Sequence, residues 1–271
     1  MLTAITRAVS PAIVNCELRF IARQPIDLQI AREQHHAYEM LLEKLGARVI
    51  SLPAEPHLPD SMFVEDPAIV LDELAVVFPL GTESRRPEAT SLAQAISKFR
   101  KLEYITLPGT AEGGDILRVG GRVFAGLSSR TNAEGIRQLK VILAPYRYEV
   151  IGVEVANCLH LKSAVTYIGR KHASGSRATF ATLLANRAWF DTEPFTGFEW
   201  VEVDPEEPHA ANALALYNTI IFPASFPNTL ARIEAAGFHV TPLDISELQK
   251  AESGLTCSSL IFHAPEPQPY L

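Results

Sequence analysis

The hydrophobic pattern of this chain repeats about every 48 residues. In each unit two short apolar runs are joined by a turn of polar residues or glycine, as in 68–71 and 74–78. Runs of this length between turn residues predict antiparallel β-hairpins. The other predicted hairpins begin at Asp115, Ser163 and Leu214, and we expect the one from Ser163 to turn at Gly169. Helical patterns follow three of the four hairpins, over 87–101, 131–143 and 228–236.

The two ends of the chain together complete a fifth unit. The last apolar strand, 255–263, has no partner after it, whereas 3–7 is an apolar strand with no hairpin partner before it. A helix over 29–45 and a strand over 48–52 then follow. Pairing of the two terminal strands would close a ring of strand–strand–helix–strand units and leave no open sheet edge. An ordinary mixed α/β sheet is the alternative that the same elements allow.

Residues able to perform catalysis occupy matching positions in the five units. Glu65 and Asp66, Glu112, His160, Asn212 and Cys257 stand at the predicted strand starts, and the spacing from Glu112 to His160 is 48 residues. In a ring such starts converge on the axis, so a thiol, an imidazole and carboxylates would meet there. That combination is what a cysteine nucleophile requires. A lone cysteine or histidine is more often a buried structural residue, which is our interpretation of Cys16 and Cys158.

The charged residues around these positions indicate the kind of substrate. Carboxylates beside a thiol suit a guanidinium group, whose N–H donors pair with carboxylate oxygens. Arg85, Arg86 and Arg130 follow the hairpins of two adjacent units. Surface charge or helix capping would account for them, but capture of a carboxylate is the functional alternative. Guanidinium at one end and carboxylate at the other describe an arginine-like amino acid.

Composition excludes several other classes of function. The net charge is −7 and no basic run occurs, which disfavours nucleic acid and anionic membranes as partners. No apolar run approaches the ~20 residues of a membrane span, and the N-terminus lacks the apolar core of a signal peptide. Three dispersed cysteines favour a reducing, cytoplasmic location. No paired metal-ligand spacing or phosphate-binding glycine motif is present, so we expect no metal and no cofactor.

Five segments of the chain, in order, resemble the motifs of the dimethylargininase (dimethylarginine dimethylaminohydrolase) family. They are Phe63-Val-Glu-Asp-Pro-Ala-Ile-Val, Glu112-Gly-Gly-Asp-Ile-Leu-Arg, Gly126-Leu-Ser-Ser-Arg-Thr-Asn, Cys158-Leu-His-Leu-Lys-Ser and Gly254-Leu-Thr-Cys-Ser. This family belongs to the guanidino-group modifying superfamily, with arginine deiminase and the amidinotransferases. The resemblance implies a five-bladed α/β propeller (pentein) of pseudo-fivefold symmetry, in agreement with the ring described above. We expect one catalytic domain over residues 1–271.

The resemblance also implies an activity and a set of site residues. The reaction is hydrolysis of Nω-methylated arginines to citrulline and an alkylamine through a thiouronium intermediate on cysteine, without a cofactor. Cys257 matches the nucleophile, His160 the general acid and base, and Glu112 the carboxylate that orients the histidine. The matched substrate-binding residues are Asp60, Glu65 and Asp66 for the guanidinium end, Arg85 and Arg130 for the α-carboxylate, and Leu18 and Ala251 for backbone contacts. Leu18 would lie on a mobile lid.

Two parts of the chain depart from the family pattern, and alternatives remain open. The segment 171–195 and the lid stretch 16–20 match no motif, so the motifs do not specify which guanidino substrate is preferred. An arginine deiminase-like hydrolase, or one acting on another guanidino acid, is the nearest alternative. A non-catalytic protein that binds a guanidino ligand is the alternative from another class. We expect a small molecule as the partner and leave a homodimer open.

Overall fold

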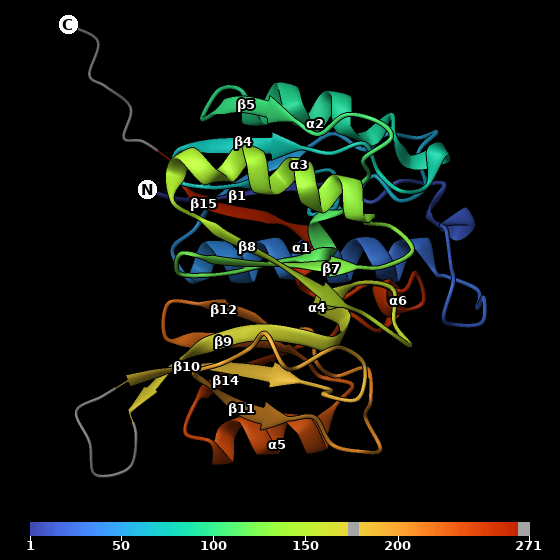
Figure 1. Ribbon diagram of the computed structural model, residues 1–271. Helices are drawn as coiled ribbons and strands as arrows, with labels where there is room; N and C mark the ends of the chain where they lie inside the picture. The colour runs from blue at the N-terminus through green and yellow to red at the C-terminus, as the bar shows by residue number, and fades with distance from the viewer. Residues whose placement is uncertain (173–178, 265–271) are drawn as a thin grey trace, which may run out of the picture.

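The chain forms five separate three-stranded sheets arranged around one axis. We describe it from a computed structural model, which covers residues 1–172 and 179–264 (Figure 1). Each sheet contains an antiparallel pair of strands and a third strand parallel to the central strand of the sheet. In sheet order the strands are β15 (Leu260–His263), β1 (Leu2–Arg7) and β2 (Arg48–Leu52); β3 (Ala68–Val70), β4 (Leu74–Val77) and β5 (Lys101–Tyr104); β6 (Ile116–Val119), β7 (Arg122–Leu127) and β8 (Glu149–Glu154); β9 (Val165–His172), β10 (Thr179–Ala185) and β11 (Phe198–Glu202); β12 (Leu214–Leu216), β13 (Thr219–Pro223) and β14 (His239–Leu243).

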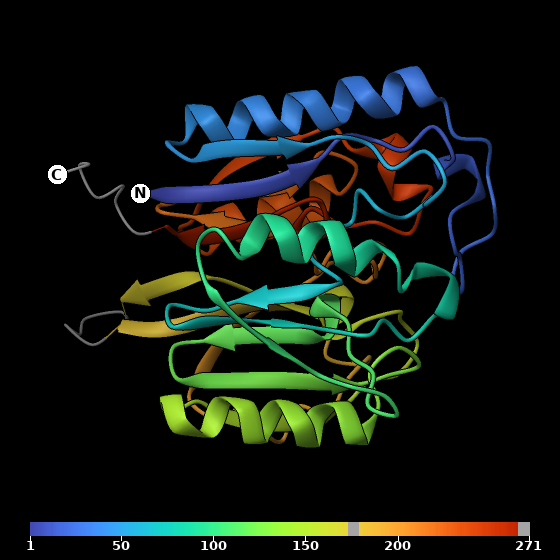
Figure 2. The same cartoon turned by 90° about the horizontal axis from the view of Figure 1, so that it is seen from above.

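Four longer helices, α1, α2, α3 and α5, lead to the third strand of a unit and lie on the outside of the ring (Figure 1 and Figure 2). Figure 2 shows α1 and α3 on opposite sides of the molecule with the sheets between them. The helices are α1 (Leu28–Lys44), α2 (Glu88–Ile96), α3 (Ala133–Leu143), α4 (Leu161–Ala164), α5 (Pro227–Ala235) and α6 (Ser246–Gln249). The strand–strand–helix–strand order is therefore confirmed for the units that contain α1, α2, α3 and α5.

The terminal strands close the ring, as predicted from the sequence. β1 pairs with β15 in antiparallel register, with Leu2 opposite His263, and with β2 in parallel register. The first strands of all five units line one cavity of about 330 Å³ at the axis, through Ala68, Leu117, Tyr167, Leu214 and Leu260 among others. The predicted five-bladed α/β propeller is thus confirmed, and the alternative of one continuous mixed sheet is wrong.

Local sequence explains where the longer helices begin and how they pack. The side chain of Asp27 accepts hydrogen bonds from the backbone N–H groups of Gln29 and Ile30 and so caps α1. Asn132 caps α3 in the same way, by accepting from Gly135 N at 2.8 Å. Ala31, Tyr38 and Leu42, spaced for one helix face, bury α1 against its sheet. Packing of this stripe, rather than propensity, holds the helix on the outside of the ring.

The fourth unit differs from the others and from our expectation. Gly169 lies inside β9 with φ of 130°, beside a β-bulge, and does not form the turn predicted there. The connection from β9 to β10 falls outside the described residues. Over 186–197, between β10 and β11, there is no helix. Aromatic side chains cover the sheet instead: the rings of Phe124 and Phe195 stack with centroids 4.1 Å apart, and Phe190 packs edge-on against Phe195 at 5.2 Å.

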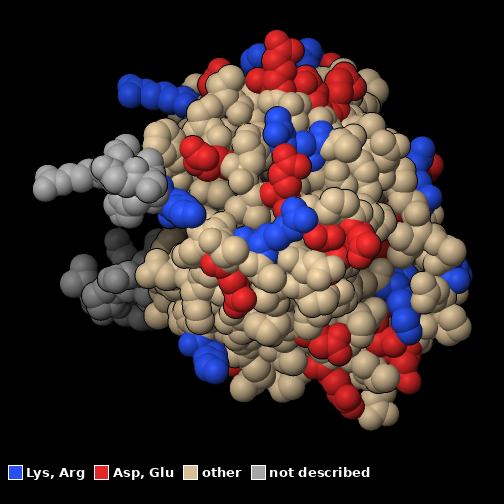
Figure 3. Space-filling model, turned by 90° about the horizontal axis from the view of Figure 1, so that it is seen from below, with Lys and Arg blue, Asp and Glu red and all other residues tan. Residues whose placement is uncertain are grey.

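The surface carries charged side chains of both signs, as the composition of the chain indicates. On the face seen in Figure 3, acidic and basic side chains are interspersed. Among the described residues, no helix has the length and apolar character needed to cross a lipid bilayer.

The aromatic cluster makes Phe124 a test of how the fourth unit is stabilised. Phe124 is fully buried, so Phe124→Ala should lower the free energy of unfolding by about 3–5 kcal/mol through lost packing and a residual cavity. Val141→Ala on nearby α3 is the control, because Val141 is 63% exposed, and it should change stability by less than about 0.5 kcal/mol. Urea unfolding followed by circular dichroism measures both. Equal losses would mean that the cluster does not hold the sheet.

Candidate active site

The predicted site residues do converge at the axis, but they precede the strands instead of starting them. Glu112 stands before a single 3₁₀ turn, Gly113–Asp115, that leads into β6. His160 precedes α4, which leads into β9. Cys257 lies in the 3₁₀ turn Thr256–Ser258, three residues before β15 begins. Single helical turns have no apolar period of their own, so the hydrophobic pattern could not separate them from the strands.

Two glycines allow the segments to approach each other so closely. A Cβ atom on Gly114 would lie 2.5 Å from Nδ1 of His160. A Cβ atom on Gly113 would lie 2.0 Å from the backbone oxygen of Glu65. Side chains at either position would therefore push two neighbouring units apart. This is the physical reason for the Glu-Gly-Gly sequence at the axis.

The centre of the site is a buried pair of Glu112 and His160. Oε2 of Glu112 lies 2.7 Å from Nε2 of His160, and both side chains are almost wholly enclosed. Gly81 N donates to Oε1 of Glu112 at 3.1 Å, and Arg130 donates to the same oxygen at 3.3 Å. The carboxylate is thus held by groups from three directions, which fixes the plane of the imidazole.

The pair has opposite pKa shifts. Burial lowers the pKa of His160, but the carboxylates of Asp66, Asp115 and Glu112 outweigh burial and raise it to about 9. Burial raises the pKa of Glu112, but its hydrogen bond to His160 and the nearby arginines outweigh burial and lower it to about 2. His160 is therefore an imidazolium at neutral pH, and Glu112 a carboxylate.

Asp115 ties together three of the sequence motifs, and our sequence analysis gave it no role. Its Oδ1 accepts a hydrogen bond from Leu161 N at 2.9 Å, and its Oδ2 accepts one from Ser128 at 2.7 Å. It is fully buried, and burial raises its pKa to about 6. Asp115 stands in the quoted Glu-Gly-Gly-Asp segment, so its place in a motif was the signal available.

Cys257 is half-buried and faces the same small cavity as His160 and Asp66. Its Sγ accepts a hydrogen bond from Gly254 N at 3.4 Å. Burial is the main cause that raises the pKa of this thiol to about 12, and the charges of Glu65 and Asp66 add to it. At neutral pH the sulfur is a thiol, beside an imidazolium.

The two arginines lie among the acids of the site. Arg85 donates to Asp66 at 3.0 Å and to both oxygens of Glu88 at 3.0 and 2.9 Å, and all three side chains are buried. Burial lowers the pKa of Arg85, but the carboxylates of Glu88, Asp66 and Glu112 outweigh burial and raise it well above its ordinary value. Arg85, Arg130 and the acids enclose a cavity of only about 20 Å³. Glu88 is a partner that the sequence did not reveal.

Asp66, Glu112 and His160 also form the one described group whose ligand atoms could hold a metal ion. One atom from each lies within 4.8 Å of the others. Imidazole and carboxylates can bind zinc. However, the guanidinium of Arg85 lies 3.0 Å from Asp66 and 3.7 Å from Glu112, so a cation of the protein already neutralises this group. We assign no metal to it, and the expectation of a reaction without cofactor stays a prediction.

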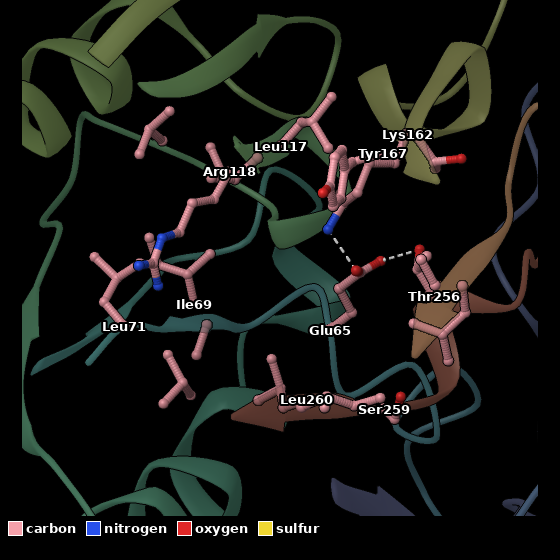
Figure 4. A pocket seen from close by; sticks show the side chains of 18 of the residues that line it. Glu65, Ile69, Leu71, Leu117, Arg118, Lys162, Tyr167, Thr256, Ser259 and Leu260 are labelled. Carbon is pink, nitrogen blue, oxygen red and sulfur yellow. Dashed lines mark hydrogen bonds and ion pairs between the residues drawn. The ribbon is translucent and has the colours of Figure 1, made fainter. Parts of the chain in front are cut away.

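Glu65 is the predicted substrate residue that the structure separates from the others. Its carboxylate points into the 330 Å³ axial cavity on the other side of the ring, where Lys162 pairs with it and Thr256 donates to it at 2.7 Å (Figure 4). Its backbone N–H donates to the carbonyl oxygen of Cys257 at 3.2 Å. Glu65 therefore supports the turn that carries Cys257, and its side chain does not reach the small cavity. Its neighbour Asp66, in the same turn before β3, lines the small cavity instead.

Of the remaining predicted residues, Asp60 and Ala251 reach the small cavity, and Leu18 lies in the segment 16–26 beside it. Asp60 and Ala251 line the cavity, and Asp60 accepts a hydrogen bond from Glu17 N at 3.1 Å. Leu18 is half-buried and packs in the same apolar cluster as Ala251 and Cys257, but it is not part of the cavity lining. Glu252, which our sequence analysis missed, accepts from the N–H groups of Arg19 and Phe20 at 2.8 and 3.0 Å. Carboxylates thus hold this segment over the site.

Comparisons with known proteins place this geometry in a family. The family model "N,N dimethylarginine dimethylhydrolase, eukaryotic" matches residues 20–257. The N(G),N(G)-dimethylarginine dimethylaminohydrolase of Pseudomonas aeruginosa is 35% identical over 87% of this chain and 90% of its own length. The Streptomyces coelicolor protein of the same name is 31% identical over 95% of each chain.

Solved structures agree with the sequence comparisons. A cysteine-to-serine mutant of the Pseudomonas aeruginosa enzyme in complex with citrulline superposes with a TM-score of 0.87 at 33% identity, over 97% of this chain and all of the other. The N-terminal domain of a cyanobacterial arginine dihydrolase superposes with a TM-score of 0.79 at 18% identity, which shows a shared fold alone. The resemblance drawn from the five motifs is confirmed. With the family model matched from residue 20 to Cys257, the chain belongs to the dimethylarginine dimethylhydrolase family.

Proposed function

We propose that this protein hydrolyses Nω-methylated arginines, asymmetric dimethylarginine and monomethylarginine, to citrulline and an alkylamine. The observation that carries the proposal is the cavity that Cys257, His160 and Asp66 line together, with Glu112 bonded to His160 behind it. The names of the two bacterial relatives support it, as do Pseudomonas aeruginosa structures in complex with citrulline and as an adduct with S-methyl-L-thiocitrulline.

The first half of the reaction forms a bond from sulfur to carbon and breaks one from carbon to nitrogen. The substrate arrives as a guanidinium, and its charge favours loss of the Cys257 proton to solvent. The thiolate attacks the central carbon to give a tetrahedral adduct. His160, already an imidazolium, protonates the alkylated nitrogen, which leaves as an amine. A cationic thiouronium remains on sulfur, stabilised by the charge of Asp66.

The second half regenerates the site. His160 is now neutral, and it takes a proton from water as the oxygen attacks the same carbon. Collapse of this adduct breaks the carbon–sulfur bond, and the proton of the added hydroxyl group passes to the departing sulfur, which gives the ureido group of citrulline and the resting Cys257 thiol. Glu112 keeps the imidazole in one orientation through both halves and favours its charged form, because it accepts the hydrogen bond from Nε2 at 2.7 Å.

Binding would exchange partners among the charged side chains. The cavity of about 20 Å³ holds roughly one water molecule, so a substrate requires the segment 16–26 to move and the arginines to turn. The substrate guanidinium would take the place of Arg85 at Asp66. Arg85 and Arg130 would then pair with the α-carboxylate, with the α-amino group near Asp60 and the backbone of Leu18 and Ala251. Glu65 would not contact the substrate and would instead support the turn that carries Cys257.

The first prediction concerns the nucleophile. Cys257→Ser should form no detectable citrulline from asymmetric dimethylarginine, because a hydroxyl is a far weaker nucleophile than a thiolate. Cys158→Ser is the matched control and should keep most of the activity, since the Cys158 thiol donates to His160 O at 3.3 Å and a hydroxyl can replace that bond. A colorimetric citrulline assay with arginine as a second substrate measures both variants. Citrulline from the Cys257 variant, or a preference for arginine, would contradict the proposal.

The second prediction concerns the protonation state of Cys257. A raised thiol pKa means that the reactive thiolate is scarce at neutral pH and increases as the pH rises toward about 12. Neutral chloroacetamide should therefore alkylate Cys257 slowly at pH 7 and faster at each higher pH. Cationic chloroacetamidine mimics the substrate charge and should react well at pH 7. Mass-spectrometric rates from pH 6 to 10 test this. Equal rates for the two reagents at pH 7 would mean that the thiol needs no cation.

The third prediction separates the two ends of the substrate. Asp66→Asn should lower kcat/KM for methylated arginine and for its decarboxylated analogue alike, because both present a guanidinium. Arg130→Ala should lose about ten- to a hundredfold on methylated arginine, the value of a charged hydrogen bond, and little on the analogue. Arg86→Ala is the control, since Arg86 bonds the backbone oxygen of Leu80 outside the cavity. Equal losses for Arg130→Ala on both substrates would mean that Arg130 is only structural.

A further inference from the structure

A second, much larger cavity meets the small one at the reactive residues. It has a volume of about 380 Å³, compared with about 20 Å³ for the charged cavity, and lies within the range of roughly 300–1,000 Å³ of small-molecule sites. We call it the outer chamber. Five residues line both cavities: Leu159, His160, Glu252, Ser253 and Cys257. The thiol and the imidazole therefore stand at the boundary between the two spaces.

The outer chamber differs chemically from the small cavity. Apolar side chains from three parts of the chain line it, namely Phe20 and Ile21, Leu159, and Phe226, with neutral polar groups such as Ser163. Its three charged side chains already have partners: His160 pairs with Glu112, Glu252 accepts the N–H groups of Arg19 and Phe20, and Lys250 pairs with Glu247 at 2.6 Å. This lining suits an uncharged, largely apolar group. It does not suit the guanidinium or the α-carboxylate, whose partners lie in the small cavity.

The proposed reaction determines which part of a substrate faces the chamber. Asp66 holds the guanidinium on the side of the small cavity, and the leaving nitrogen must reach His160 to be protonated. Because His160 lines both spaces, substituents on that nitrogen project away from Asp66. A dimethylamine leaving group has three heavy atoms and fills only a small part of such a volume.

We propose that the outer chamber is a subsite for the leaving amine that accepts N-substituents larger than methyl. The substrate class then extends to Nω-alkyl and Nω-arylalkyl arginines with side groups of about four to seven carbons. This inference rests on the proposed hydrolase function. The chemistry is unchanged: the same carbon–nitrogen bond breaks, His160 gives the proton, and a longer primary amine leaves in place of methylamine or dimethylamine.

Binding in the Cys257→Ser variant tests the subsite without turnover. Calorimetry should show that Kd for Nω-butyl- and Nω-benzyl-arginine equals or is below Kd for Nω-methyl-arginine, by up to about fourfold for each buried methylene. A rise of Kd by more than tenfold from methyl to butyl would overturn the proposal. The wild-type protein should also form citrulline from the butyl substrate. If the affinities follow the expected order while no substrate yields citrulline, the hydrolase function fails and the subsite remains.

A variant that fills the chamber provides the second test. Ser225 lines the outer chamber on an exposed loop between β13 and α5, where a larger side chain can be accommodated. In Ser225→Trp the ratio of kcat/KM for the butyl substrate to that for the methyl substrate should fall at least about tenfold. Ser97→Trp, in a separate groove beside α2, is the matched control and should leave the ratio unchanged. If kcat/KM in Ser225→Trp falls equally for both substrates, the chamber is only a passage to solvent, and the proposal is overturned.

Discussion

The structure depends on keeping a cluster of charges buried at the axis of the ring. Isolated charges in a protein interior cost several kcal/mol each, and only pairing and hydrogen bonds offset that cost. Glu112 meets this requirement with four partners: His160, Arg130, the N–H of Gly81 and, at 3.7 Å, Arg85. These partners come from three consecutive units of the propeller, those of β3–β5, β6–β8 and β9–β11, so the charges are paired only when these units pack together. Pairing of β15 with β1 then fixes the turn that carries Cys257 beside this cluster.

The same cluster explains why the two reactive groups are protonated before a substrate binds. The carboxylates that surround His160 stabilise its imidazolium, whereas burial first, and then the charges of Glu65 and Asp66, disfavour the thiolate of Cys257. A neutral ligand would change the protonation equilibrium of neither residue. A guanidinium shifts the equilibrium of Cys257 toward the thiolate, because it brings a positive charge to Asp66 and the sulfur. It leaves His160 able to donate its proton. The electrostatics of the site thus favour reaction with cations, which accords with the proposed substrate class.

Sequence pattern predicted the fold well because both of its signals are periodic. Alternating apolar runs and turns revealed the hairpins, and the spacing from Glu112 to His160 revealed the units. Gly169 was misread because a bulge and a turn both favour a glycine with positive φ. The direction of Glu65 could not be predicted either, because whether a carboxylate faces one side of the ring or the other depends on Lys162, 97 residues away. Glu88 and Glu252 belong to no motif, and only tertiary contacts reveal them.

The two sides of the axis show how one ring can hold both a reactive centre and its support. On one side Asp66 and His160 face the charged cavity, and on the other the Glu65 carboxylate bonds Lys162 and Thr256 (Figure 4). Asn212 links these supports, since its side chain donates to the backbone oxygen of Lys162 at 3.1 Å and accepts from Thr256 N at 3.0 Å. Lys162 lies two residues from His160, and Thr256 is next to Cys257. The supporting network therefore joins the backbones of both reactive residues, and their relative position depends on polar bonds that no substrate needs to disturb.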